Sequence, residues 1–365
     1  MGIFRKGRRL SGRMNPYSRR AETVKADSLL LLKEFQNILE SLRGAKILIT
    51  GSTGMIGSYL GWLLLYLSDK LDLHVFLHGR NTEKLKLYYQ DFWESGRCHI
   101  VTFDLAQKHP RGVLCDYIIH TASLANNYAF KMYPTKVMEP NILGTWMLLD
   151  YCKESGAKLL LCSSSAIYGE TERTQSVLSE SAYGIVDPLS SRACYTESKR
   201  CAEQMCAAFT REYAVKTNIV RISHTYGPTF DIENDGRVLP RSIKKILSSQ
   251  DIELYDDPDA IVQYTYVGDI CSAILDVMIQ GVSGEAYNVC GDEMLPLPQI
   301  IEYMLDGTPE SLSKLVLVPI DERYAFKKGS GVNIKKLDNG KLKALGWKSL
   351  FSGKIGFRRT IQSYI

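Results

Sequence analysis

The sequence lacks the cysteine spacings that build disulfide frameworks or zinc sites. Its nine cysteines are an odd number, lie scattered through apolar segments and include no C-x-x-C pair, so neither kind of site is indicated. Long apolar runs are missing as well, because the longest, 29–32 and 63–67, are far shorter than the ~20 residues that cross a bilayer. The composition therefore predicts a soluble, cytoplasmic protein with reduced thiols, no bound metal and no membrane span.

Beyond the N-terminus, the chain has no large excess of either positive or negative residues. The chain has 45 lysines and arginines against 40 aspartates and glutamates, and seven of the basic residues, with no acid, fall within residues 1–20. The rest of the chain is nearly neutral, which disfavours specific binding of nucleic acid across a folded face. We interpret residues 1–26 as a basic tail without fixed structure, as is usual for blocks of like charge.

An additional helix is expected between this tail and the first strand. Asp27 or Ser28 can cap its N-terminus, apolar residues then recur at helical spacing, and Gly44 ends it. The pattern predicts an N-terminal extension over residues 27–44.

From residue 45 onward the chain alternates between apolar, strand-like runs and helical stretches. Strands that are apolar on both faces are typical of a parallel sheet covered by helices on both sides, which predicts a Rossmann-type, doubly wound α/β domain over residues 45–226. After residue 226 the rhythm changes, so residues 227–365 are expected to form mainly a smaller α/β lobe for the substrate, with segments near 262–291 returning to the first domain. The runs interpreted as strands are 46–50, 74–77, 99–103, 117–121, 158–162 and 218–222.

A glycine-rich turn follows the first predicted strand directly. Glycine permits both a tight turn and a close approach of the backbone to a pyrophosphate, and the N-terminus of the following helix offers N–H donors to the same anion. A strand, a turn of this kind and a helix in succession predict a dinucleotide site rather than a turn without a ligand. The predicted cofactor contacts of the turn are Gly51, Thr53, Gly54, Met55, Ile56 and Gly57.

The end of the second predicted strand leaves the choice of cofactor open. A NAD site typically has an acid there, about 20 residues beyond the glycines, to hold the ribose 2′-hydroxyl, whereas this strand is followed by Gly79 and Arg80. Arg80 could face the 2′-phosphate of NADP or could be a solvated loop residue. After the third strand, Asp104 and the adjoining Leu105 are placed to contact adenine, although a lone Asp there could equally cap a helix. We expect NAD, with NADP as the alternative.

A tyrosine and a lysine one helical turn apart provide the strongest chemical signal. Tyr195 and Lys199 have i,i+4 spacing in a segment of helical composition, so they share one face of a helix. A fixed neighbouring cation favours phenolate and lowers the tyrosine pKa from about 10. The phenolate could then take a proton from a sugar hydroxyl as hydride leaves. Such spacing is common by chance, so the pair needs support from other residues.

That support comes from three consecutive serines at the end of a buried strand. Ser163, Ser164 and Ser165 follow the apolar run 158–162, where strand ends face the ligand crevice of a doubly wound sheet. A serine hydroxyl there can donate to the substrate oxygen while the phenol handles its proton. Any one of the three could merely cap a turn, but the three together favour a catalytic role.

These motifs stand in the order found in a known enzyme family. Besides the glycine turn, the serines and the tyrosine–lysine pair, the chain has His120-Thr121-Ala122 at a strand end, Asn141 before a Gly-Thr pair, and Tyr226-Gly227-Pro228. Together they resemble the extended short-chain dehydrogenase/reductase family, and more narrowly its NAD-dependent nucleotide-sugar epimerases and dehydratases. The resemblance extends from about residue 46 to the C-terminus.

The resemblance implies roles for individual residues. Tyr195 would be the catalytic base, Lys199 would lower its pKa and hold the nicotinamide ribose, and Ser164 would orient the C4 oxygen of the sugar. Ala122 and Asn141 would support the cofactor site, which Tyr195 and Lys199 would also contact. The resemblance further implies a nucleotide-sugar substrate and a homodimer.

Family members share oxidation at C4 and differ in the step that follows. Dehydratases carry Asp-Glu directly after the position of Ser164, where this chain has Ser165 and Ala166, and decarboxylases carry Glu at Ala166 and Arg at Val262. The missing acids favour a 4-epimerase, in which the ketone turns over and takes hydride back on its other face. We therefore expect a nucleotide-sugar 4-epimerase acting in surface-glycan precursor synthesis. The alternatives are NADPH-dependent reduction of a 4-keto sugar, decarboxylation, dehydration and a non-enzymatic cofactor-binding scaffold.

Contacts with the substrate diphosphate depart from the family pattern. Epimerases commonly have Asn at the position of His224 and Arg at that of Val262 to hold the phosphates. His224 could itself be a phosphate donor, a catalytic group or a structural residue, and Arg237, Arg241 or Arg323 could supply compensating charge. The predicted substrate contacts are Ser165, His224 and Arg237.

Overall fold

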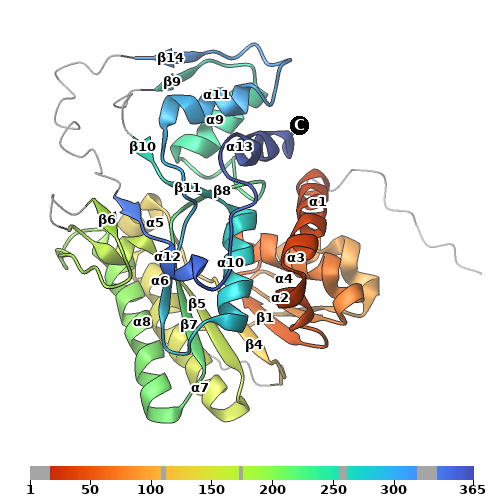
Figure 1. Cartoon of the computed structure of the whole chain (residues 1–365), viewed down its shortest axis with the longest axis vertical. Coiled ribbons are helices and arrows are strands. Elements are labelled where there is room, and N and C mark those ends of the chain that lie inside the picture. The colour runs from red at the N-terminus through yellow and green to blue at the C-terminus, as the bar shows by residue number, and fades with distance from the viewer. Residues whose placement is uncertain (1–16, 108–111, 172–175, 255–260, 319–334) are drawn as a thin grey trace, which may run out of the picture.

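A seven-stranded parallel sheet forms the centre of the molecule (Figure 1). The computed structural model describes residues 17–107, 112–171, 176–254, 261–318 and 335–365, and within them the strand order is β12-β7-β5-β4-β1-β2-β3. All six runs predicted as strands belong to this sheet, which confirms the doubly wound α/β fold. The strands are β1 (Lys46–Thr50), β2 (His74–His78), β3 (Cys98–Val101), β4 (Tyr117–His120), β5 (Lys158–Ser164), β7 (Thr217–Ile222) and β12 (Ala286–Val289).

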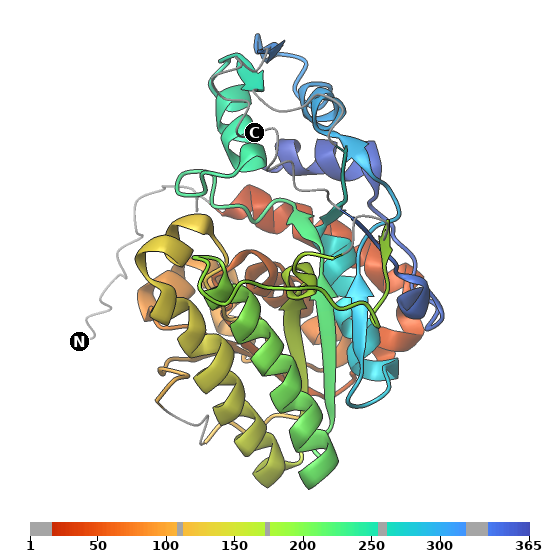
Figure 2. The same ribbon diagram turned by 90° about the vertical axis from the view of Figure 1, so that its left-hand side faces the viewer.

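The main helices that cover the sheet are α3 (Met55–Leu71) and α10 (Val267–Gln280) on one face, and α7 (Thr145–Ser155) and α8 (Ala193–Tyr213) on the other. In β1, Ile47 and Ile49 belong to one buried cluster with side chains of α3 and α10, whereas Leu48 belongs to a second cluster with side chains of α7 and α8. Successive side chains of a strand point to opposite faces, so a wholly apolar strand requires cover on both. Figure 2 shows α7 and α8 side by side.

A smaller lobe lies at the top of both views (Figures 1 and 2). It contains α9 (Val238–Leu247), α11 (Leu297–Leu305), α13 (Gly353–Gln362) and the paired strands β9 (Ile252–Leu254) and β14 (Leu315–Leu317). Parts of the segment near 262–291 lie with the first domain, because α10 packs on α3 and β12 extends the central sheet beside β7. The lobe joins the sheet through β8 (His224–Tyr226) and β11 (Tyr264–Tyr266), which pair in parallel.

None of the helices in the described residues has the length and apolarity that a membrane crossing requires.

Shorter elements connect these parts. The remaining elements are α4 (Thr82–Tyr88), α5 (Asn127–Met132), α6 (Pro134–Glu139), α12 (Gly340–Lys343), β6 (Val177–Leu178), β10 (Ile261–Val262), β13 (Leu295–Pro296), β15 (Lys336–Leu337), the 3₁₀ helices Gln90–Ser95 and Ser165–Tyr168, and the π-helical turn Pro140–Gly144.

The N-terminal helix begins earlier than the sequence indicated. The structure has α1 (Ser18–Glu34), followed after a break at Phe35 by α2 (Gln36–Glu40). The expected cap at Asp27 or Ser28 is therefore wrong, since both residues lie inside α1 and are buried. The physical reason is tertiary contact, because Asp27 accepts hydrogen bonds from residues distant in the sequence. Residues 1–16 of the predicted basic tail lie outside the described residues.

Candidate active site

The glycine turn between β1 and α3 is tight enough that side chains would fill it. Gly51 has a φ of +71°, in the left-handed region that favours glycine. A Cβ atom there would lie 2.7 Å from the Cα of Ala122, and one on Gly57 would overlap the carbonyl oxygen of Gly51. Since α3 begins at Met55, its first N–H groups are available to an anion at the turn. The other predicted contacts of the turn, each at least partly exposed, are Thr53, Gly54 and Ile56.

Ala122 is held against this turn by the end of β4. Thr121 donates from its hydroxyl to the carbonyl oxygen of Thr50 at 2.6 Å, and His120 Nδ1 shares a hydrogen bond of 2.7 Å with the Thr50 hydroxyl. Burial lowers the pKa of His120 to about 3, so its imidazole is neutral and serves as a hydrogen-bonding link. The carboxyl ends of β1 and β4 are thereby locked together beside the turn.

The predicted adenosine contacts lie after β2, which pairs with β1, and after β3, which pairs with β2. Arg80 is exposed and Leu105 is buried. Asp104 is half-buried, and its Oδ1 accepts a hydrogen bond of 3.1 Å from the backbone N–H of Ala106, which is a local turn contact. Burial lowers the pKa of His78 to about 4, while Asp104 raises it and Arg80 lowers it, so both charged groups lie close to this ring.

Asn141 lies in the π-helical turn and is fully buried. Its Nδ2 donates to the carbonyl oxygen of Val137 at 3.0 Å and to the hydroxyl of Ser198, the residue before Lys199, at 2.9 Å. No described residue donates to its buried Oδ1. An unpaired buried acceptor is costly, and π-bulges are frequent at functional sites. This open acceptor and the glycine turn both fit a bound dinucleotide.

Ser164, Tyr195 and Lys199 come together where the carboxyl end of β5 meets the first turns of α8. The Ser164 hydroxyl lies close enough to the Tyr195 phenol to lower its pKa, and its Oγ accepts a hydrogen bond from the backbone N–H of Ala166 at 3.1 Å. The buried Lys199 donates from Nζ to the carbonyl oxygen of Cys162 at 2.8 Å and lies 6.0 Å from the centre of the Tyr195 ring. The three residues singled out from the sequence thus share one site.

The electrostatics of this site differ from the expectation that Lys199 lowers the pKa of Tyr195. The pKa of Tyr195 is raised, because burial of the phenol outweighs the groups that favour phenolate. Those groups are the Ser164 hydroxyl and the charges of Arg192 and Arg237. Burial also lowers the pKa of Lys199 to about 8. The Lys199 ammonium is directed to a backbone carbonyl rather than to the phenol.

Arg192 is a residue of the site that our sequence-based prediction missed. It is the N-cap of α8, and its guanidinium lies 5.8 Å from the centre of the Phe130 ring. Phe130 in turn stacks on Tyr195 with ring centres 5.1 Å apart. Its proximity to the phenol could not be predicted from the sequence, because it depends on the contact between Phe130 of α5 and Tyr195 of α8.

The predicted substrate contacts lie around the same phenol. Arg237 pairs with Asp235, with Nη2 and Oδ2 2.5 Å apart, so part of its charge is neutralised. The His224 side chain is exposed, and its pKa is lowered by desolvation in the surrounding protein and by the charges of Arg237 and Arg192. Ser165 opens the 3₁₀ helix after β5 and is partly buried. Arg192 and Arg237 therefore form a positively charged side of the site, next to the His224 side chain, whose lowered pKa favours the neutral imidazole.

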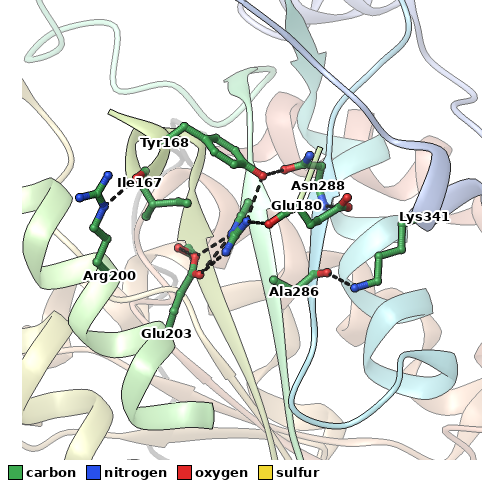
Figure 3. A network of polar contacts seen from close by, with 10 residues as sticks. Ile167, Tyr168, Glu180, Arg200, Glu203, Ala286, Asn288 and Lys341 are labelled. Carbon is green, nitrogen blue, oxygen red and sulfur yellow. Dashed lines mark hydrogen bonds and ion pairs between the residues drawn. The ribbon is translucent and has the colours of Figure 1, made fainter. Parts of the chain in front are cut away.

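A buried ion pair near Ser164, Tyr195 and Lys199 was also missed by the sequence-based prediction. Glu203 of α8 pairs with Arg221 of β7, with Nη2 and Oε2 2.9 Å apart and both side chains largely buried. Figure 3 shows Glu203 reaching from its helix into this network. Two signals could have found it: a charged residue inside the apolar run 218–222, and the spacing of four residues from Lys199 to Glu203.

Solved structures with the same fold include nucleotide-sugar enzymes. UDP-glucose 4-epimerase with UDP-glucose from Thermotoga maritima has a TM-score of 0.70 at 20% identity, and the match covers 87% of this chain and 98% of that one. dTDP-glucose 4,6-dehydratase from Bacillus anthracis in complex with NAD has a TM-score of 0.69 at 20% identity, covering 88% and 96%. At these identities the likeness shows the fold alone.

Curated relatives include UDP-glucuronic acid decarboxylases. Decarboxylase 1 of Xenopus tropicalis is 31% identical over 240 residues, which are 65% of this chain and 54% of the relative, so this chain spans about half of that protein's length. Decarboxylase 1 of Danio rerio is 27% identical over 324 residues, which are 87% and 72%. The model of the NAD dependent epimerase/dehydratase family matches residues 47–290, more than half of the chain. The chain is therefore an enzyme of the NAD dependent epimerase/dehydratase family, with NAD as its cofactor.

Proposed function

We propose that this chain is a nucleotide-sugar 4-epimerase that works through a transient 4-keto sugar. The observation that carries the proposal is the contact between Ser164 and the Tyr195 phenol, beside Lys199 and the glycine turn. A hydroxyl donor and a proton acceptor at one point are what oxidation of a secondary alcohol requires.

Each residue of the set has a distinct task in this reaction. Tyr195, as phenolate, takes the proton of the C4 hydroxyl, and Ser164 donates a hydrogen bond to the same oxygen. Arg192 and Arg237 favour the phenolate, and the charge of Lys199 can hold the cofactor ribose. When bound, NAD would supply the acceptor for the C4 hydride and could also return it. If the ketone turns over between the two transfers, Tyr195 returns the proton and the C4 epimer leaves.

The surroundings of Tyr195 favour epimerisation over elimination. The described groups that shift its pKa are Ser164, Cys162, Arg192 and Arg237, and none of them is a carboxylic acid. The residue after Ser164 is a serine and the next an alanine. Elimination of water needs an acid to protonate the leaving hydroxyl, and hydride return to C4 does not.

Decarboxylation is the second candidate, favoured by the positively charged side of the site. The charges of Arg192 and Arg237 suit a sugar that carries a carboxylate, and the relatives named above are UDP-glucuronic acid decarboxylases. Oxidation at C4 turns a hexuronate into a β-keto acid, which loses CO₂ without help from a protein acid. A nucleotide-linked hexuronate could therefore be epimerised or decarboxylated by the same three residues.

The decisive experiment gives NAD-loaded protein UDP-glucuronate, UDP-glucose and UDP-N-acetylglucosamine, and follows the sugars by NMR and CO₂ release in parallel. We expect a C4 epimer without net formation of NADH. Release of one CO₂ per sugar with a UDP-pentose product would replace the epimerase by the decarboxylase. Tyr195→Phe, which keeps the ring and removes the phenol hydroxyl, should abolish either reaction. Full activity in this variant would exclude Tyr195 as the base, whereas bound NAD without any turnover in the wild type would support the scaffold alternative.

We also propose that the enzyme is a cytoplasmic homodimer. All nine cysteines are free thiols, which suits a reducing compartment. Apolar side chains exposed near α7 and α8, such as Leu143, Trp146 and Tyr213, would be covered by a second copy through these helices. Light scattering of the wild type and of Trp146→Glu tests the dimer, since a charge at a buried interface should give monomers, whereas an unchanged mass would exclude this face.

A further inference from the structure

The buried carboxylate of Glu203 joins the catalytic helix α8 to the serine strand β5. Glu203 lies four residues after Lys199, on the same face of the helix. Lys199 donates to the carbonyl oxygen of Cys162 at 2.8 Å, and Glu203 accepts from the hydroxyl of the next residue, Ser163, at 2.5 Å. The helix therefore holds the strand at two consecutive residues just before Ser164.

A row of three polar residues crosses the sheet at this level. In the strand register, Ser163 of β5 lies beside Arg221 of β7, and Arg221 lies beside Asn288 of β12. Arg221 donates to both carboxylate oxygens of Glu203, at distances of 2.9 to 3.2 Å. The side chains of this pair are only 9% and 12% exposed. Glu203 thus takes hydrogen bonds from two adjacent strands at once.

The same network reaches the segment that follows Ser164. Arg221 Nη1 donates to the hydroxyl of Tyr168 at 3.1 Å, and that hydroxyl donates to Asn288 Oδ1 at 2.6 Å (Figure 3). Tyr168 ends the 3₁₀ helix that comes directly after Ser164. The backbone is therefore fixed on both sides of Ser164, at Ser163 before it and at Tyr168 after it.

Stability alone does not account for this ion pair. Desolvation of two charges offsets most of their attraction, and apolar side chains of similar volume often serve as well. A fully bonded buried network instead fixes one arrangement of the elements that it joins. Here those elements are β5 and α8, whose relative position sets the distance between the Ser164 hydroxyl and the Tyr195 phenol. Ser164 is one of the groups that lower the pKa of Tyr195 against the effect of burial.

We propose that Glu203 is a positioning residue for the reaction: it holds β5 against α8 so that Ser164 stays within hydrogen-bond reach of the Tyr195 phenol. The inference rests on the proposed function, in which these two hydroxyls act on the same substrate oxygen. A displacement of about 1 Å at such a site can cost about a hundredfold in rate. Loss of the Glu203 carboxylate should therefore affect the reaction more than the binding of NAD.

The test compares Glu203→Gln with Glu212→Gln, an exposed residue on the last turn of the same helix. Ultraviolet difference titration of the NAD-loaded proteins, with Tyr195→Phe as the blank, gives the pKa of Tyr195 without any substrate. Reduction of bound NAD by UDP-glucuronate in a single turnover gives the rate. We expect Glu203→Gln to raise the pKa of Tyr195 by about half a unit or more, because the Ser164 hydroxyl that lowers this pKa is no longer held close to the phenol. We also expect a rate about a hundredfold lower, with the Kd for NAD changed less than twofold.

A Tyr195 titration and a rate equal to those of the Glu212→Gln control would overturn the inference, as would a loss of NAD binding in proportion to the loss of rate. Should Glu203→Gln fail to fold, Ser163→Ala removes one bond of the network and keeps the ion pair, and it should move the Tyr195 pKa in the same direction. If the wild type reduces no bound NAD with UDP-glucuronate, UDP-glucose or UDP-N-acetylglucosamine, the proposed function fails, and the titration still decides the role of Glu203.

Discussion

Asp27 of the N-terminal helix accepts a hydrogen bond of 2.8 Å from Nε of Arg359 in the C-terminal helix α13. The same carboxylate accepts from the hydroxyl of Tyr59 in α3 at 2.8 Å and from that of Tyr266 in β11 at 2.7 Å. Asp27 is fully buried. One carboxylate therefore ties α1, which precedes the part of the chain matched by the family model, to both the sheet domain and the lobe.

Removal of this carboxylate should destabilise the whole molecule. Asp27→Ala leaves Arg359 and two tyrosine hydroxyls without their acceptor, and breaking a buried ion pair from one side typically costs about 3–5 kcal/mol. We expect the free energy of unfolding in urea to fall by about that amount. Glu22→Ala, which removes an exposed partner of Lys25 in the same helix, should change it by less than about 1 kcal/mol. Equal effects of the two substitutions would mean that the buried contact adds little.

The glycine turn offers a prediction about cofactor binding. Gly51→Ala places a Cβ 2.7 Å from the Cα of Ala122, in a residue with a φ of +71°, so the turn must shift and the N–H groups that face the pyrophosphate move with it. We expect the Kd for NAD, measured by calorimetry, to rise about a hundredfold, which corresponds to about 2.7 kcal/mol. Gly96→Ala is the matched control, since Gly96 has a similar φ of +66° and open space around it. It should share the backbone strain and keep NAD affinity.

The fold could be predicted because its signals are local. Six of the seven strands of the central sheet follow mainly apolar runs such as 46–50, and the alternation of strands and helices follows directly from the order of such runs. The start of α1 could not be predicted in this way. The stretch around Arg19 and Arg20 is highly charged, yet Ala21 and Val24 are buried against other elements. Nothing in the local pattern indicates that such a charged helix will pack against the rest of the protein.

The site was predicted where spacing along one element decides the geometry. Tyr195 and Lys199 share a helix face because they are four residues apart, and Ser164 lies at the end of its strand. Contacts between separate elements could not be predicted from the sequence. The pairing of Glu203 with Arg221 joins a helix to a strand, and the net rise in the pKa of Tyr195 results from burial by several segments.

The lowered pKa of Lys199 predicts how the reaction depends on pH. Burial is the main cause, and it brings the pKa to about 8 from the usual 10.5. A lysine that holds the cofactor ribose as a cation loses its charge as the pH rises through this value, so kcat should fall above about pH 8. In Lys199→Arg the guanidinium stays protonated at every accessible pH, and this alkaline fall should disappear even if the overall rate is lower.

A stopped-flow pH series from about pH 6 to 10 checks this prediction for both proteins. Lys158→Arg is a suitable control, because Lys158 is a lysine at the opposite end of β5 with a pKa that burial also lowers. It should keep the profile of the wild type. An alkaline fall that persists unchanged in Lys199→Arg would assign that limb to another group.

Arg192 provides the prediction that separates a charged sugar from a neutral one. Its cation lowers the pKa values of both Tyr195 and His224, so Arg192→Gln should raise the pKa of Tyr195 and move the acidic limb of the rate to higher pH. If the substrate carries a carboxylate on this side of the site, the variant also loses a charge-assisted contact of about 1.5–3 kcal/mol. The KM for UDP-glucuronate should then rise about tenfold or more, while the KM for UDP-glucose stays unchanged. Arg211→Gln, in the last turn of α8, serves as the control, and a parallel rise in both KM values would show that Arg192 acts on the nucleotide diphosphate rather than on the sugar.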